Sequence, residues 1–275
     1  MKPCSIYRTV ALILLFLLSV IVSGQNKEFP YQLMLEDVVI IALGLSVNYY
    51  GDYRMEHQER MTSEELMSLS KDDINCFDRG ATNYWNDDLH NMSSVTKGIL
   101  RTAPSVILIN EAFSKEFKNV LTYAVMYYEV LIVTSGFTSL TKSLAMRKRP
   151  YLYNTSISFE EREQMIEEGN VYDSFFSGHT SAAFASAVFL SKSYRDIYGN
   201  NTLSKVILWT SLSLAVTTGY LRYRSGHHYP TDIIAGAVFG SAVGYLVPTL
   251  HLKKKNKSKV SVITSGNMLA LVYRF

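Results

Sequence analysis

The sequence predicts an all-α fold, an integral membrane bundle of about five to six helices. Of its 275 residues, 48% are hydrophobic and 19% charged, which is too much apolar material for a disordered chain. The longest apolar runs, residues 120–140 and 233–252, are apolar nearly all round, whereas helices of soluble cores are usually amphipathic. A soluble all-α core is the less favoured alternative. The net charge of +3 is too small to indicate a nucleic-acid partner.

The N-terminus has the pattern of a secretory signal peptide. Lys2 and Arg8 precede a short apolar run at residues 10–22, and the small residue Gly24 follows closely. A membrane span needs about 20 residues, so we expect residues 1–24 to be a signal peptide that is cleaved near Gly24. An uncleaved anchor helix is the alternative.

The rest of the chain divides into three parts. Residues 25–96 form an N-terminal segment with a possible first membrane helix at residues 38–50 and a polar loop. Residues 97–252 form the predicted bundle, which opens with another short run at residues 98–113. Residues 253–275 form a basic tail.

Four further runs in the bundle are predicted to be helices, because their lengths and apolar patterns favour helix over strand. They are residues 120–140, 181–190, 206–221 and 233–252. The last run carries Gly236, Gly240 and Gly244 at every fourth position, a spacing that permits close helix packing in lipid.

The first chemically informative cluster follows the run 120–140. It consists of Lys142 and Arg149, with six residues between them, and Pro150. Arg offers a planar fork of donors that suits tetrahedral oxyanions, and Lys offers a point charge. Taken alone, such cations are more typical of membrane-interface anchors.

The second cluster, Ser177, Gly178 and His179, opens a run of small residues. Unpaired N–H groups at a helix N-terminus can bind an anion, and Gly178 allows close backbone approach. Ser177 can cap the helix. His179 titrates in the range that suits a general acid near neutral pH.

The third cluster consists of Arg222, His228 and Asp232. Pro230 suits the first turn of a helix, which places His228 at the helix entry. Asp232, four residues later, can reach back to the imidazole, and a carboxylate on one ring nitrogen leaves the other nitrogen nucleophilic. We expect the adjacent His227 to point elsewhere.

Together the clusters resemble the signature of the type-2 phosphatidic acid phosphatase (PAP2) superfamily, which is Lys-x6-Arg-Pro, Pro-Ser-Gly-His and Ser-Arg-x5-His-x3-Asp. The first part is complete here. Phe176 replaces the Pro of the second part and Leu221 the Ser of the third, and both departures fall on positions that shape loops. The resemblance implies that residues 97–252 are a PAP2-type catalytic bundle.

The resemblance also implies the reaction. His228 would attack phosphorus and form a phosphohistidine, Asp232 would orient His228, and His179 would protonate the leaving oxygen and then activate water. The phosphate-binding groups would be Lys142, Arg149, Ser177, Gly178 and Arg222. The family needs no metal or other cofactor, and fixed cations can stabilise the charge of phosphoryl transfer.

The expected substrate is a phosphomonoester or pyrophosphate of a membrane lipid, of the undecaprenyl diphosphate, lipid A or phosphatidylglycerol phosphate class, and no obligate protein partner is evident. The alternatives are a soluble periplasmic non-specific acid phosphatase of the same superfamily, a vanadate haloperoxidase and a non-enzymatic membrane scaffold or transporter. A metal site formed by His179, His227, His228 and Asp232 is a further alternative, but the nearby cations would repel a divalent ion.

The clusters follow or precede alternate runs, so they are predicted to lie on one side of the membrane. Cations concentrate on the other side: Lys115, Lys118, Lys192, Arg195, Lys205 and the lysine cluster 253–259. The positive-inside rule then predicts a bacterial inner membrane protein whose active site faces the periplasm. A cleaved signal peptide would reverse this orientation if both short runs crossed, so we expect one of the runs 38–50 and 98–113 not to cross.

Overall fold

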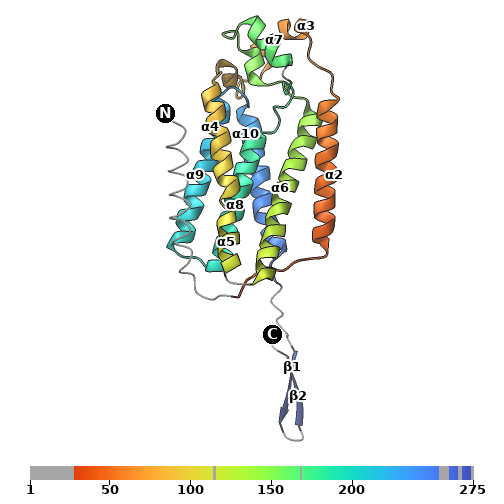
Figure 1. Cartoon of the computed structure of the whole chain (residues 1–275), viewed down its shortest axis with the longest axis vertical. Coiled ribbons are helices and arrows are strands. Elements are labelled where there is room, and N and C mark those ends of the chain that lie inside the picture. Colours follow the sequence, from red (N-terminus) through yellow and green to blue (C-terminus); the bar gives the residue numbers. More distant parts are fainter. Residues whose placement is uncertain (1–27, 114–115, 168, 254–259, 266–267, 274–275) are drawn as a thin grey trace.

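The computed structural model describes residues 28–113, 116–167, 169–253, 260–265 and 268–273. The predicted signal peptide, residues 1–24, lies outside the described residues, as do Lys115 and most of the lysine cluster. The described part of the chain is a bundle of long helices with a cap at one end and a two-stranded hairpin beyond the other (Figure 1).

The predicted all-α fold is confirmed. The long rods are α2 (Glu36–Glu56), α4 (Asp87–Thr102) with α5 (Ser105–Phe113), α6 (Phe117–Ala145), α8 (Gly178–Tyr198), α9 (Thr202–Arg224) and α10 (Pro230–Leu250). The short elements are α3 (Ser63–Met67), α7 (Phe159–Glu167) and the 3-10 turns η1 (Lys71–Asp73), η2 (Arg79–Asn83) and η3 (Pro150–Tyr153). In the basic tail, β1 (Val260–Ser265) pairs antiparallel with β2 (Met268–Tyr273).

Both short apolar runs lie in helices that extend along the bundle. Residues 38–50 lie inside α2, and residues 98–113 fall in α4 and α5, which follow each other closely around Pro104. Figure 1 shows α2 and the α4–α5 pair alongside the other rods. Neither α2 nor the α4–α5 pair is among the described helices that are long and apolar enough to span a membrane, so the expectation that one of these runs does not cross stays a prediction.

Local sequence signals fix the helix ends at the capped end of the bundle. Met146 adopts a left-handed conformation, with φ of 43°, and ends α6. The Ser177 side chain accepts a hydrogen bond from the Thr180 N–H at the start of α8, which is the capping role expected of it. Pro230 is the first residue of α10. The end of α6 and the starts of α8 and α10 thereby meet at one end of the bundle.

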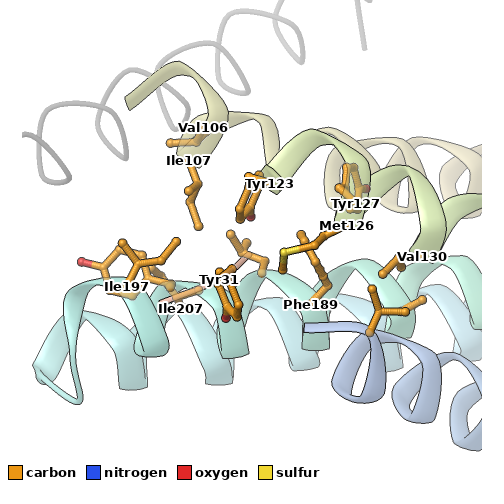
Figure 2. Packing of buried hydrophobic residues seen from close by; sticks show 14 of the residues in the cluster. Tyr31, Val106, Ile107, Tyr123, Met126, Tyr127, Val130, Phe189, Ile197 and Ile207 are labelled. Atoms are coloured by element: carbon orange, nitrogen blue, oxygen red, sulfur yellow. The ribbon is translucent and has the colours of Figure 1, made fainter. Parts of the chain in front are cut away.

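Aromatic and aliphatic side chains fill the half of the bundle away from the cap. Figure 2 shows Tyr123, Met126 and Tyr127 of α6 facing Phe189 of α8. The Tyr127 and Phe189 rings stack with centroids 5.0 Å apart. These contacts hold α6 against α8 and so fix the distance between two helices that carry site residues at their capped ends.

The predicted close packing of the glycine-bearing run is present between α10 and α8. A Cβ on Gly236 would lie 2.7 Å from the Ser177 carbonyl oxygen, and one on Gly240 or Gly244 would overlap a carbonyl oxygen of α8. The glycines therefore let the two backbones touch, which positions Ser177 beside the start of α10.

Gly240→Val is expected to destabilise the protein by about 3 kcal/mol or more, because the added atoms would have to push backbone apart. Thermal unfolding in detergent, followed by loss of near-ultraviolet circular dichroism, measures the effect. Gly98→Ala is the matched control, since a Cβ at Gly98 meets nothing within 4 Å. Equal unfolding temperatures for the two variants would contradict the packing account.

The cap over the site end has its own apolar core. It contains Met61 and Leu66 from the segment before α4, and Tyr151, Leu152 and Ile166 from the segment between α6 and α8. The two segments therefore pack together and enclose the loops that carry site residues.

Candidate active site

All eight predicted site residues lie at the capped end of the bundle. They are Lys142 near the end of α6, Arg149 in the loop that follows, Ser177, Gly178 and His179 at the start of α8, Arg222 at the end of α9, His228 before α10 and Asp232 in its first turn. Helix polarity explains the convergence, because α6 and α9 run toward this end and α8 and α10 begin there (Figure 1).

The His228 imidazole is held by a backbone carbonyl. Its side chain is only 1% exposed, and its Nδ1 lies 2.7 Å from the Ser174 carbonyl oxygen. A carbonyl only accepts hydrogen bonds, so Nδ1 carries the proton and Nε2 keeps its lone pair. This is the tautomer that a nucleophilic Nε2 requires.

Asp232 does not orient His228 in the direct way that the sequence suggested. Its Oδ2 lies 3.6 Å from His228 Nδ1, which is beyond hydrogen-bond distance. Oδ2 instead accepts hydrogen bonds from Ser174 Oγ at 2.6 Å and from the Tyr229 N–H at 2.9 Å. Asp232 therefore contacts Ser174, the residue whose carbonyl holds the imidazole, and is connected to His228 indirectly.

A network of ion pairs connects Asp232 to the segment before α4. Arg147 donates to Asp232 Oδ1 and, at 2.8 Å, to Asp78 Oδ2. Asp78 also accepts hydrogen bonds from the N–H and Oγ of Thr231. Burial raises the pKa of Asp78, but the hydrogen bonds from Asn75, Arg147 and Thr231 outweigh it and hold the pKa below its usual value.

Three cations surround the imidazole. Burial first, and then the charges of Arg222, Arg149 and Lys142, lower the pKa of His228 well below its usual value. Burial with Arg222 and Arg149 likewise lowers the pKa of His227. A lowered pKa favours the uncharged form of both imidazoles at neutral pH, so the positive charge beside them is that of the three cations.

The protein should lose stability in mild acid. Unfolded histidines take up a proton near pH 6.5, whereas folded His227 and His228 resist it, so each costs about 1.4 kcal/mol per pH unit below that value. The unfolding temperature in phosphate-free buffer should fall between pH 7 and pH 5.5. His227→Gln should flatten the fall relative to wild type, and identical profiles for the two proteins would contradict this assignment.

Arg222 and Arg149 are pinned by neighbouring groups. Arg222 is 2% exposed, and its guanidinium donates to His90 Nδ1 at 2.6 Å. Arg149 is 8% exposed and donates from Nε to the Asn170 carbonyl at 2.7 Å. Fixed guanidinium groups with spare donors form a preorganised site for phosphate oxygens.

Gly178 brings the backbone of α8 close to the cations. A Cβ on this residue would lie 3.1 Å from Thr138 Cγ2 and 3.9 Å from Lys142 Nζ. The free N–H groups of the first turn of α8 therefore lie beside the Lys142 ammonium, as an anion site requires.

Helix α4 contributes a row of side chains that the sequence analysis missed. His179 Nε2 lies 3.0 Å from Ser94 Oγ and 3.3 Å from Lys97 Nζ, and His90 contacts Arg222. Residues 90, 94 and 97 share one face of a helix. That spacing was visible in the sequence, but only the fold places α4 beside α8 and α9.

A cleft next to the cations has room for a headgroup. Its volume is about 510 Å³, and it is lined by Trp85, His90, Arg149 and His227 among others. The His227 ring stacks on Trp85 with centroids 5.3 Å apart. The expectation that His227 points away from the site is therefore corrected, since it lines this cleft.

Comparison with known proteins agrees with the geometry. Residues 123–256 match the PAP2 superfamily. This part of the chain, which holds all eight predicted site residues, belongs to that superfamily. No solved structure matches the chain significantly.

Three curated relatives share this region. The lipid A 4'-phosphatase of Porphyromonas gingivalis is 29% identical over 128 residues, which is 46% of this chain and 50% of that protein. The probable diacylglycerol pyrophosphate phosphatase 1 of Schizosaccharomyces pombe is 36% identical over 97 residues, 34% of each chain. A PA-phosphatase related-family protein of Dictyostelium discoideum is 31% identical over 128 residues, 44% of this chain and 45% of that protein. The chain thus spans half or less of the length of these relatives.

Proposed function

We propose that the protein is a membrane lipid phosphatase that works through a phosphohistidine at His228. The observation that carries the proposal is the buried imidazole of His228, whose Nδ1 is held by the Ser174 carbonyl and whose pKa is lowered by burial and by the charges of Arg222, Arg149 and Lys142. The names of the relatives, a lipid A 4'-phosphatase and a diacylglycerol pyrophosphate phosphatase, support a substrate that is a lipid phosphomonoester or pyrophosphate.

In the first half-reaction, the His228 Nε2 lone pair attacks phosphorus. The N–P bond forms while the bond between phosphorus and the leaving oxygen breaks, and His179 donates a proton to that oxygen. Arg222, Arg149 and Lys142 stabilise the charge on the phosphoryl oxygens as it develops. The products are the dephosphorylated lipid and the phosphorylated imidazole.

In the second half-reaction, His179 accepts a proton from water, and the water oxygen attacks phosphorus. The N–P bond breaks, inorganic phosphate leaves and His228 regains its lone pair. Ser94 and Lys97, which contact His179 Nε2, position this imidazole for both proton transfers. Every step uses side chains of the chain itself, so we propose that turnover needs no metal, which predicts full phosphate release in the presence of a chelator.

Membrane embedding is supported by the outer surface of the bundle. Among the described residues, two helices, α6 and α10, are long and apolar enough to span a membrane. Large apolar side chains also face outward on several rods: Val38, Val39 and Leu43 on α2; Phe137 on α6; Val206, Trp209 and Val216 on α9; and Ile234, Val238, Leu246 and Leu250 on α10. Exposed apolar surface of this extent is typical of a lipid-facing protein rather than a soluble one. The soluble acid phosphatase alternative is tested by carbonate extraction, which should leave the protein in the membrane fraction.

A second groove lies beside the site, between α4, α6 and α8. It has a volume of about 180 Å³, and its lining includes Lys97, Arg101 and Gly178 together with Val130, Leu131 and Ala182. A lipid that places its phosphate near Lys97 and Gly178 would have apolar side chains of this groove beside its chain.

Ala182→Phe is expected to raise KM for a lipid phosphate at least about 10-fold, because the ring would fill the groove. Hydrolysis of a small soluble phosphomonoester should change less than about twofold, since the cations are untouched. Val188→Phe, which changes a residue lining a different cavity on α8, is the control. An equal loss on both substrates would argue that the groove does not bind the lipid.

The distribution of charge supports an active site on the periplasmic face of a bacterial inner membrane. The end of the bundle opposite the site carries Lys118, Lys192, Arg195 and Lys205, and the positive-inside rule assigns such an end to the cytoplasm. If one of the runs 38–50 and 98–113 does not cross, this orientation agrees with cleavage near Gly24; if both cross, it requires an uncleaved N-terminal segment. A reporter fused after Lys259 tests this orientation. Reporter activity in the cytoplasm supports the proposed orientation, and reporter activity only after export would reverse it.

The substrate is tested with the purified protein in detergent. Phosphate release is measured on undecaprenyl diphosphate, lipid A and phosphatidylglycerol phosphate, with His179→Ala and His228→Ala as controls. Release from at least one lipid that both substitutions abolish is the expected result. Absence of release from every lipid, together with activity on soluble esters, would favour the acid phosphatase alternative.

A further inference from the structure

A second cluster of ionisable side chains lies far from the active site. Asp37 in the first turn of α2, Glu129 in α6 and His251 at the end of α10 face one another. Their ligand-type atoms all lie within 4.8 Å of one another. Asp232 and His251 sit near opposite ends of α10, which separates the two sites by about 28 Å at 1.5 Å per residue.

The cluster is buried and under-satisfied. Glu129 and His251 are 0% exposed, and Asp37 is 4% exposed. Both carboxylate oxygens of Glu129, Oδ1 of Asp37 and Nε2 of His251 lack a hydrogen-bond partner within the described ranges. The ring of His251 is the ion-pair partner that the described residues give these two carboxyl groups. Burying polar atoms with so few partners is costly, and the four atoms lie close enough together to share one positive ligand.

Hydrogen bonds to the backbone hold His251 and Asp37 so that one side-chain atom of each faces the cluster. His251 Nδ1 donates to the Val247 carbonyl at 2.9 Å, which leaves the Nε2 lone pair facing the cluster. Asp37 Oδ2 accepts the Met34 N–H at 2.8 Å, which leaves Oδ1 facing it. Histidine ligands of metals typically donate their other ring N–H to a carbonyl in this way.

The spacing fits a divalent transition metal. His251 Nε2 lies 3.2 Å from Asp37 Oδ1 and 3.6 Å from Glu129 Oε2. Two ligands at about 2.0–2.2 Å from a tetrahedral ion are separated by about 3.4 Å. Two carboxylates also neutralise a divalent ion, and an imidazole favours zinc over magnesium or calcium.

Two backbone segments are hydrogen-bonded to each other beside the cluster. The Gln32 N–H donates to the His251 carbonyl at 3.0 Å, and the Lys253 N–H donates to the Pro30 carbonyl at 2.9 Å. These bonds join the segment before α2 to the segment after α10 and hold His251 near Asp37. An ion there would bridge α2, α6 and α10.

We propose that Asp37, Glu129 and His251 bind one Zn²⁺ ion that clips together α2, α6 and α10. The ion has a structural role, because it lies far from the phosphate site. The proposal does not depend on the phosphatase activity, and its test has readouts other than turnover.

The full-length protein in detergent is treated with chelator, desalted and titrated with Zn²⁺ and with Co²⁺. We expect saturable uptake of one equivalent, a Co²⁺ absorption band of tetrahedral intensity and a rise in unfolding temperature of about 5 °C at a hundredfold excess over Kd. Glu129→Gln and His251→Gln should lose the uptake and the shift. Glu111→Gln, which changes another buried carboxyl on α5, should keep both.

Two outcomes overturn the proposal. One is the absence of saturable uptake by the wild-type protein, a result that needs no variant to be folded. The other is wild-type stoichiometry in folded Glu129→Gln and His251→Gln, which would place the ion elsewhere. In either case the cluster would be satisfied by shared protons, and the assignment of the phosphatase site would stand unchanged.

Discussion

His228→Ala should abolish phosphate release, with a loss of at least about 10³-fold in kcat, because the substitution removes the proposed acceptor of the phosphoryl group. The imidazole is almost fully enclosed, and its Nδ1 is committed to the Ser174 carbonyl, so only Nε2 can react. A steady-state assay on a lipid phosphate measures the effect.

The control for this loss is another histidine. His57 is exposed at the end of α2, where its ring packs on Tyr53. His57→Ala should therefore leave turnover within about twofold of wild type. Near wild-type activity in a folded His228→Ala protein would remove the basis of the covalent mechanism.

Asp232→Asn should lower kcat at least about 100-fold and also destabilise the protein by about 3 kcal/mol. The stability loss follows because the amide would present N–H donors toward the Arg147 guanidinium and break a buried ion pair. The activity loss follows because Asp232 holds Ser174 through its Oγ, and a displacement of the imidazole by about 1 Å is enough for such an effect.

A double-mutant cycle separates this indirect role from direct contact with His228. Ser174→Ala removes the hydroxyl that donates to Asp232 Oδ2 and keeps the carbonyl that accepts from His228. If Asp232 acts through Ser174, the losses in kcat should be strongly non-additive. Additive losses would mean that Asp232 acts on His228 by another path.

The convergence of the site could be predicted from sequence because motif order and helix polarity determine it. Lys142 ends one apolar run, His179 opens the next, Arg222 ends the third and His228 precedes the last. In an antiparallel bundle these positions must meet at one end, as the structure confirms. The glycine spacing in α10 also predicted a contact, because small residues at every fourth position allow the backbone of a neighbouring helix to approach closely.

The details of contact could not be predicted in the same way. A spacing of four residues permits a hydrogen bond between Asp232 and His228. In the structure, Ser174 in the loop before α8 contacts both residues instead: its hydroxyl donates to Asp232, and its carbonyl accepts from His228. The contribution of α4 likewise depends on which helix lies beside α8. His90 and Lys97 belong to no motif, so only the fold identifies them.

The covalent intermediate is the central claim, and trapping it is the most direct test. The protein is mixed with a ³²P-labelled lipid phosphate under single-turnover conditions, quenched in alkali and digested for mass spectrometry. We predict a label that is stable in alkali, labile in acid and located on His228. Turnover without any labelled protein, or a label on another residue, would contradict the mechanism.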